Sequence, residues 1–244
     1  MTSNKRQVVR ISAMSLIFGV ICSVSDPTMA ARPFVTDDAR LTQAGSCQIE
    51  SWSRFYRSTN EFWALPACNP TGGFELTIGA GRAFYRGFET NDYIIQGKTL
   101  FRTLEAGSFG WGIAAGKIAH PAVNPGPNLL GNHYIYIPFS AASQDYKQVL
   151  HINLGALRNQ SAGDLRGTWG LGLELNQSDR LQWIAEAFGD HTSRPFVQAG
   201  ARYAIQKNLL QIDMTLGGQS YGPVSSRWLS VGLRYTPDDI LRFR

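Results

Sequence analysis

The sequence has few charged residues and, after its first thirty residues, no long apolar run. Charged residues make up 17% of the chain, well below the roughly 25% of an average soluble domain. After Ala31 no stretch approaches the about 18 consecutive apolar residues that indicate a membrane-spanning helix. A closed β-barrel is the other structure that crosses a bilayer, because its backbone amides are all paired internally.

The sequence also lacks the patterns of several kinds of binding site. It has no run of lysine and arginine despite a formal net charge of +5, which argues against a nucleic-acid partner. His120, His133 and His151 do not have the spacing of metal ligands. The glycines of 79–81 and 107–116 do not follow a phosphate-loop pattern. We therefore expect no metal and no cofactor.

What the composition does contain is glycine, at 25 residues, and aromatic side chains, at 11%. Both are typical of an outer-membrane barrel, whose interfaces carry girdles of aromatic residues. A soluble β-sandwich has a similar composition and remains an alternative fold.

Residues 1–30 have the pattern of a Sec signal peptide. Lys5, Arg6 and Arg10 form a basic start, and an apolar stretch of about 14 residues, 11–24, follows. That stretch is shorter than the roughly 20 residues of a membrane anchor. Because the small-residue site of 28–30 comes next, we expect cleavage after Ala30 or Ala31.

The mature chain alternates apolar and polar residues, which is the pattern of β-strands. In the stretch 168–176, for example, Trp169, Leu171, Leu173 and Leu175 alternate with glycine and polar residues. The pattern predicts twelve antiparallel strands near 46–57, 61–68, 73–83, 92–103, 108–118, 132–140, 147–157, 168–176, 181–187, 197–205, 210–216 and 229–235.

The predicted connections alternate, imperfectly, between long and short. The later long ones are 119–131, 158–166, 189–194 and 217–226, and the short ones include 176–180 and 206–208. Outer-membrane barrels have long extracellular loops, short periplasmic turns and an even number of strands. The stretch 139–147 is longer than expected for such a turn. The pattern nevertheless favours a barrel over a sandwich.

If the apolar face contacts lipid, the polar face lines a lumen. A two-residue turn at Lys207-Asn208 would place Arg202 opposite Asp213, with Arg234 diagonal to Asp213 on the next strand. These charges are candidates for a selectivity or solute-binding cluster, and the alternative is a salt-bridge network that fills a small barrel. The predicted lumen residues are Glu75, Gln96, Lys98, Arg102, His151, Asn153, Glu174, Glu186, Arg202, Asp213 and Arg234.

Two cysteines of the mature chain, Cys47 and Cys68, flank a predicted hairpin centred near Arg57-Ser58. The hairpin would place them opposite each other, and an even pair in an exported protein suggests a disulfide. Two buried free thiols are the alternative.

A His-x-Ser pattern at His191-Thr192-Ser193 is the one candidate for catalysis. Outer-membrane lipid hydrolases use serine as nucleophile and histidine as its base. Those enzymes hold the pair on a strand at the lipid-facing rim, whereas this tripeptide lies in a predicted loop, 189–194. We therefore expect no catalytic residue and keep a lipid hydrolase using His191 and Ser193 only as an alternative function.

Short motifs at both ends resemble a family of proteobacterial barrels. The start, Arg32-Pro33-Phe34-Val35-Thr36-Asp37-Asp38-Ala39, and the tail stretches 186–189, 198–203 and 231–235 are similar to barrels described as outer-membrane transporters or components of the meta-pathway of phenol degradation. The resemblance implies transport of small, aromatic molecules and transfers no catalytic residue. The chain ends in Phe243-Arg244 rather than on an aromatic residue, so Tyr235 would close the last strand.

Together these patterns predict a signal peptide over 1–30 and a single antiparallel transmembrane β-barrel over 31–244 in the cell outer membrane. Its partners would be outer-membrane lipid, the barrel-assembly machinery and a small-molecule solute that the sequence does not identify. The expected function is a passive or facilitated channel, and a structural barrel without transport is the second alternative.

Overall fold

The computed structural model describes residues 35–85, 87–119, 133–159 and 163–237. The predicted signal peptide 1–30, the proline-rich stretch 120–127 and the C-terminal Phe243-Arg244 lie outside this part of the chain. Within it the chain forms twelve strands and one short 3-10 helix, η1 (Val224–Ser226). No helix among the described residues is long and apolar enough to span a membrane.

The twelve strands lie close to the ranges that the alternation predicts. They are β1 (Ser46–Tyr56), β2 (Thr59–Asn69), β3 (Phe74–Tyr85), β4 (Phe88–Arg102), β5 (Phe109–Ala119), β6 (His133–Ala142), β7 (Gln148–Arg158), β8 (Leu165–Asn176), β9 (Leu181–Asp190), β10 (Phe196–Gln206), β11 (Leu210–Gln219) and β12 (Trp228–Tyr235).

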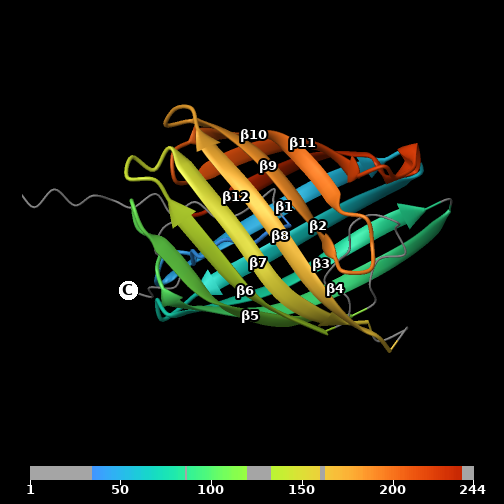
Figure 1. Cartoon of the computed structure of the whole chain (residues 1–244), viewed down its shortest axis with the longest axis horizontal. Helices are drawn as coiled ribbons and strands as arrows, with labels where there is room; N and C mark the ends of the chain where they lie inside the picture. Colours follow the sequence, from blue (N-terminus) through green and yellow to red (C-terminus); the bar gives the residue numbers. More distant parts are fainter. Residues whose placement is uncertain (1–34, 86, 120–132, 160–162, 238–244) are drawn as a thin grey trace, which may run out of the picture.

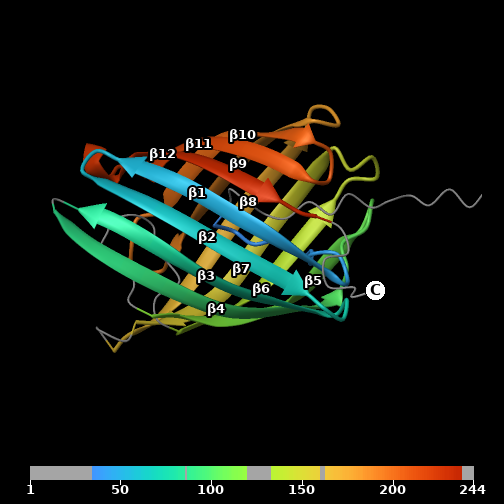
Figure 2. The ribbon, with the colours of Figure 1, turned by 180° about the vertical axis from the view of Figure 1, so that it is seen from behind.

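Every strand pairs antiparallel with its neighbours in the chain, and β1 pairs with β12, so the sheet is a closed barrel (Figures 1 and 2). The closing register runs from Ile49 opposite Tyr235 to Tyr56 opposite Trp228. Closure leaves no strand edge with unpaired amides. The predicted fold class is therefore confirmed, and the last strand ends at Tyr235 as expected.

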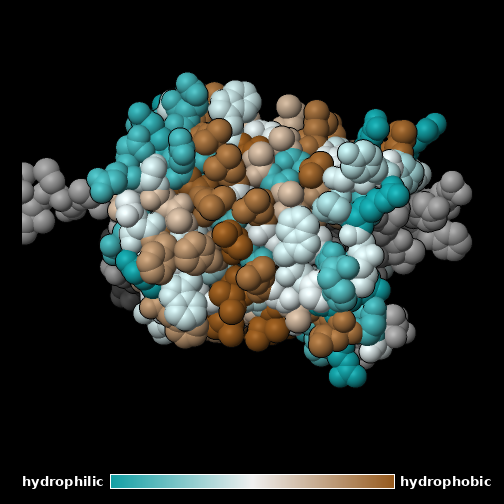
Figure 3. Space-filling view, in the orientation of Figure 1, coloured by the Kyte–Doolittle hydropathy of each residue, from teal (hydrophilic) through white to brown (hydrophobic). Residues whose placement is uncertain are grey.

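The apolar side chains of the strands point outward. Leu171, Leu173 and Leu175 of β8 are all more than one third exposed, whereas Glu174 between them is fully buried. The space-filling view shows apolar side chains across the middle of the molecule and hydrophilic ones at its two ends (Figure 3). This distribution suits a bilayer, because the apolar band contacts acyl chains and the polar ends meet water.

The chain enters β1 and leaves β12 at the same end of the barrel. That end also has the connections 70–73, 103–108, 143–147, 177–180 and 207–209. The opposite end has the two-residue connections 57–58 and 86–87 as well as the longer connection 220–227. The connection predicted over 139–147 covers only 143–147, because β6 continues to Ala142. In its turn, outside the barrel wall, the hydroxyl of Ser143 donates to Asp145 (2.7 Å) and holds the pKa of that carboxyl below its usual value.

Candidate functional site

The residues before the first strand fold into the barrel. Residues 35–42, here called the lumen segment, contact side chains of β3, β4 and β6 to β9. Asp38 and Ala39 have no exposed surface, and the amide of Ala39 donates to the hydroxyl of Ser140 on β6 (2.9 Å). In an open pore these groups would be exposed to water. The segment therefore lies buried inside the lumen.

Two carboxylates of the wall hold the ends of the lumen segment. At its start, Glu186 of β9 accepts hydrogen bonds from the amides of Val35 (2.8 and 3.1 Å) and Thr36 (2.9 Å). At its end, Glu75 of β3 accepts from both the amide and the hydroxyl of Thr42, each at 2.7 Å. Hydrogen bonds to an ionised acceptor are stronger than neutral ones, so these two contacts fix the position of the segment.

Asp37 binds three side chains of the wall between β3 and β9. Its carboxylate lies 3.0 Å from the ammonium of Lys98 on β4 and accepts a hydrogen bond from the hydroxyl of Tyr136 on β6 (2.7 Å). The amide of Asn153 on β7, in the orientation that satisfies both of its ends, accepts from the backbone amide of Asp37 and donates to its carbonyl (2.6 and 2.8 Å). These contacts bind the segment to the wall between its two ends.

Glu174 of β8 is the centre of a buried charge cluster. Its carboxylate lies 3.3 Å from the guanidinium of Arg40, 3.3 Å from that of Arg202 and 3.5 Å from His151. Arg40 also pairs with its neighbour Asp38 at 3.0 Å. A buried carboxylate needs such partners because desolvation penalises its charge. Arg40 therefore supplies, from the lumen segment, part of the charge balance of the wall.

Glycine on β8 allows the close approach of the segment. A Cβ added at Gly170 would lie 2.5 Å from the hydroxyl oxygen of Thr36. A larger side chain at this position would therefore push Thr36 away from the wall.

The structure brings most of the predicted lumen residues into this network. Lys98, Glu174, Glu186 and Arg202 take part in it as described above. Arg202 stands opposite Asp213 in the register, as the hairpin predicts, although three residues, 207–209, and a bulge between Ala204 and Gln206 form the connection.

The other two charged candidates lie at different places. Arg234 is buried on β12, donates to Gln48 of β1 (3.0 and 3.2 Å) and lies 3.9 Å from Glu50. Arg102, in contrast, is exposed, and its guanidinium lies 3.9 Å from the centre of the Phe109 ring. A register shift between Leu100 and Arg102 changes the alternation there. Arg102 is therefore not part of the lumen cluster.

The lumen segment and a buried aromatic cluster are not among the features predicted from the sequence. Tyr56, Phe188, Phe196 and Trp228 form this cluster inside the barrel, and Val35 packs against it. Their phase on the strands points them inward, so the alternation itself carried the signal. The acidic stretch Asp37-Asp38 between the predicted cleavage site and β1 was the signal for the segment.

His191 and Ser193 are bound to other partners than each other. Nδ1 of His191 accepts a hydrogen bond from the amide of Gly167 (3.0 Å). The hydroxyl of Ser193 donates to the carboxylate of Asp190 (3.4 Å), which also accepts from the amides of Thr192 and Ser193. These contacts form a turn after β9 rather than a nucleophile and its base.

Cys47 and Cys68 stand opposite each other on β1 and β2 and form a disulfide, with their Cα atoms 4.0 Å apart. Elsewhere in the described residues, no group of three or more histidine, cysteine or acidic residues has the arrangement of a metal site.

Comparison with solved structures supports the porin-like fold. The KdgM porin aligns with a TM-score of 0.56, at 11% identity, over 77% of this chain and 98% of its own. The same porin in complex with disordered oligogalacturonate gives 0.58, with the same identity and coverage. The NanC porin gives 0.51 at 9% identity, over 78% of this chain and 98% of its own.

Comparison of sequences gives one family. No curated protein matches the chain. The matches give no support to the meta-pathway family that the short motifs resemble. A family model described as "Uncharacterised conserved protein UCP029691" matches residues 19–236, which is most of the chain. The chain therefore belongs to this family.

Proposed function

We propose that the protein is a passive channel of the outer membrane for small solutes, closed at rest by its own lumen segment. The barrel, its apolar outer face and its charged lumen support a channel in a bilayer. One observation supports the proposal that the channel is closed at rest: residues 35–42 lie in the lumen but belong to none of the twelve strands. Wall side chains hold the segment, and such contacts can break while the barrel stays intact.

The proposed orientation places the start of β1 and the end of β12 on the periplasmic side and connection 220–227 outside. This orientation follows the usual arrangement of outer-membrane barrels, whose turns are short on the periplasmic side. Residues 1–30 would act as the export signal. The lumen segment would then be reached from the periplasm, because it directly precedes β1.

The charge of the wall favours neutral or cationic solutes. Among the described strand residues, seven buried carboxylates face four buried basic side chains: Glu61, Glu75, Asp92, Glu174, Glu186, Asp190 and Asp213 against Arg54, Lys98, Arg202 and Arg234. The excess of carboxylates gives the wall a net negative charge, which concentrates cations. The solute class would thus differ from oligogalacturonate, the polyanion in the KdgM complex.

The aromatic cluster supports a further narrowing of the solute class. Aromatic rings favour offset or edge-to-face contact with other rings, and Tyr56, Phe188, Phe196 and Trp228 gather four rings inside the barrel. Small aromatic solutes, which the resemblance to the phenol-pathway barrels suggests, would suit this lining.

Planar-bilayer recording tests the proposal. The mature protein should conduct rarely, and a variant lacking residues 35–42 should conduct steadily. Under a salt gradient, the reversal potential of the deletion variant should indicate a preference for cations. A folded deletion variant that stays silent would contradict the channel and favour a structural barrel. A steady conductance with anion preference would contradict only the solute class.

A further inference from the structure

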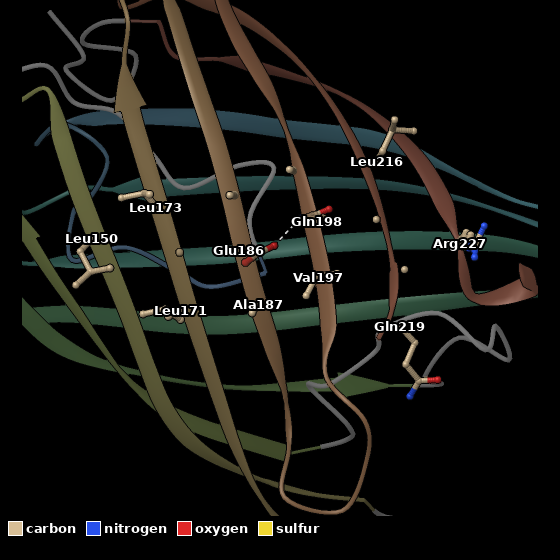
Figure 4. A pocket seen from close by; sticks show the side chains of 15 residues that line it. Leu150, Leu171, Leu173, Glu186, Ala187, Val197, Gln198, Leu216, Gln219 and Arg227 are labelled. Atoms are coloured by element: carbon tan, nitrogen blue, oxygen red, sulfur yellow. Dashed lines mark hydrogen bonds between the residues drawn. The ribbon is translucent and has the colours of Figure 1, made fainter. Parts of the chain in front are cut away.

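An apolar groove lies on the outer face of the barrel, across β8 to β11 (Figure 4). Its volume is about 740 Å³. Small residues form its floor: Ala185 and Ala187 of β9 and Ala199 of β10. Leucines border it on β8 and β11, including Leu171 and Leu216. The groove exists because two adjacent strands carry alanine where their neighbours carry leucine.

The strand register places a basic side chain at one end of the groove. Leu171, Ala187, Val197 and Gly218 stand side by side on β8, β9, β10 and β11. Arg227 directly precedes β12, whose first residue pairs with the neighbour of Gly218 on β11. A Cβ added at Gly218 would lie 3.1 Å from Cγ of Arg227. The stem of Arg227 therefore lies against Gly218, at one end of the row.

The charge of Arg227 has no partner within the described residues. No carboxylate there forms an ion pair with it, and its side chain is exposed. Arg166, near the same end of the barrel, differs: its guanidinium lies 2.7 Å from Asp164 and 3.5 Å from Asp190. Figure 4 shows Arg227 beyond the leucines and alanines, at the edge of the groove. An acyl chain in the groove would therefore have a free cation at its head-group end.

We propose that this groove binds a phosphorylated lipid of the outer leaflet, lipid A, with an acyl chain over the alanines and a phosphate on Arg227. Burial of acyl methylenes against the floor supplies apolar contact. A guanidinium suits phosphate, to which it can donate two parallel hydrogen bonds. The choice of lipid A rests on the proposed orientation, which places Arg227 in the outer leaflet. The proposal does not depend on conduction.

Native mass spectrometry of the full mature chain, purified from isolated outer membranes in mild detergent, tests the site. The protein should retain lipid A, and Arg227→Glu should lower its occupancy roughly tenfold or more, as expected for loss of a hydrogen bond between charged groups. Ala187→Leu should lower it too, because leucine fills the floor. The matched controls Arg158→Glu, on another exposed arginine at the end of a strand, and Ala115→Leu, on an outward alanine of β5, should leave it unchanged.

Three results would overturn the proposal. The full-length protein could carry no lipid A, or lose it equally in the control variants. It could retain added phosphatidylglycerol as well as lipid A, which would make the site one for phosphate lipids in general. It could form a dimer that Ala187→Leu disrupts, which would assign the groove to a second copy. Absence of the protein from the outer-membrane fraction would instead contradict the proposed location.

Discussion

Replacing Glu186 with glutamine should open the channel without changing the barrel. Glu186 accepts three hydrogen bonds from the amides of Val35 and Thr36. Its Oε1 also accepts from Gln198. Glutamine has the same shape, but one of its two terminal atoms donates, so it would face an amide that also donates. The substitution therefore weakens the hold on the start of the lumen segment.

The size of the effect follows from the contact that is lost. A hydrogen bond to a charged group contributes about 1.5–3 kcal/mol. Loss of one such bond, taken as about 2 kcal/mol, would raise the ratio of open to closed channels about 30-fold, since 1.4 kcal/mol is about a factor of ten. The remaining contacts of the segment, those of Asp37, Arg40 and Thr42, should still close the channel part of the time. The Glu186→Gln channel should thus open and close repeatedly, whereas the deletion variant should stay open.

Single-channel recording in planar bilayers measures this ratio from the open and closed dwell times. Glu89→Gln is the matched control, because it removes a carboxylate that pairs with Arg82 and is half exposed rather than buried beside the segment. Heat-modifiable migration in gels would confirm that both variants fold. If Glu186→Gln gates like the control while the deletion variant opens, Glu186 does not hold the segment. If the deletion variant also gates like the unaltered protein, the segment does not close the lumen.

Three further substitutions test other parts of the structure. Gly170→Val should raise the open fraction of the channel, because a side chain at this position displaces Thr36. Gly167→Val, on the same strand, should leave the open fraction unchanged, because a Cβ there would have no contact closer than 3.6 Å. Equal effects of the two variants in single-channel recordings would contradict the close approach of Thr36 to Gly170. Serine at both Cys47 and Cys68 should destabilise the barrel by about 3 kcal/mol, because it removes a cross-link between residues 21 apart. The double variant should therefore lose its heat-modifiable migration at a lower temperature. An unchanged temperature would contradict a stabilising role of the disulfide. Ser193→Ala should leave fatty-acid release from outer-membrane vesicles unchanged, and a loss of release would revive the hydrolase alternative.

The local sequence pattern is sufficient to predict the barrel wall. Alternation has a period of two, so each stretch such as 168–176 states both its strand and its outward face, with no reference to the rest of the chain. Hairpins are also local, which is why the sequence alone predicts Arg202 opposite Asp213 and Cys47 opposite Cys68. The prediction that Arg102 faces the lumen was wrong, because a register shift between Leu100 and Arg102 reverses the alternation.

The contents of the lumen, in contrast, depend on contacts between residues far apart in the sequence. Glu186 meets Val35 across 151 residues of sequence, and Glu174 meets Arg40 across 134. No local pattern specifies such pairs, because they depend on the closure of the barrel and on the path of a segment without regular structure. The groove is similar in origin: its alanines are visible in the sequence, but only the register of β8 to β11 aligns them with Arg227.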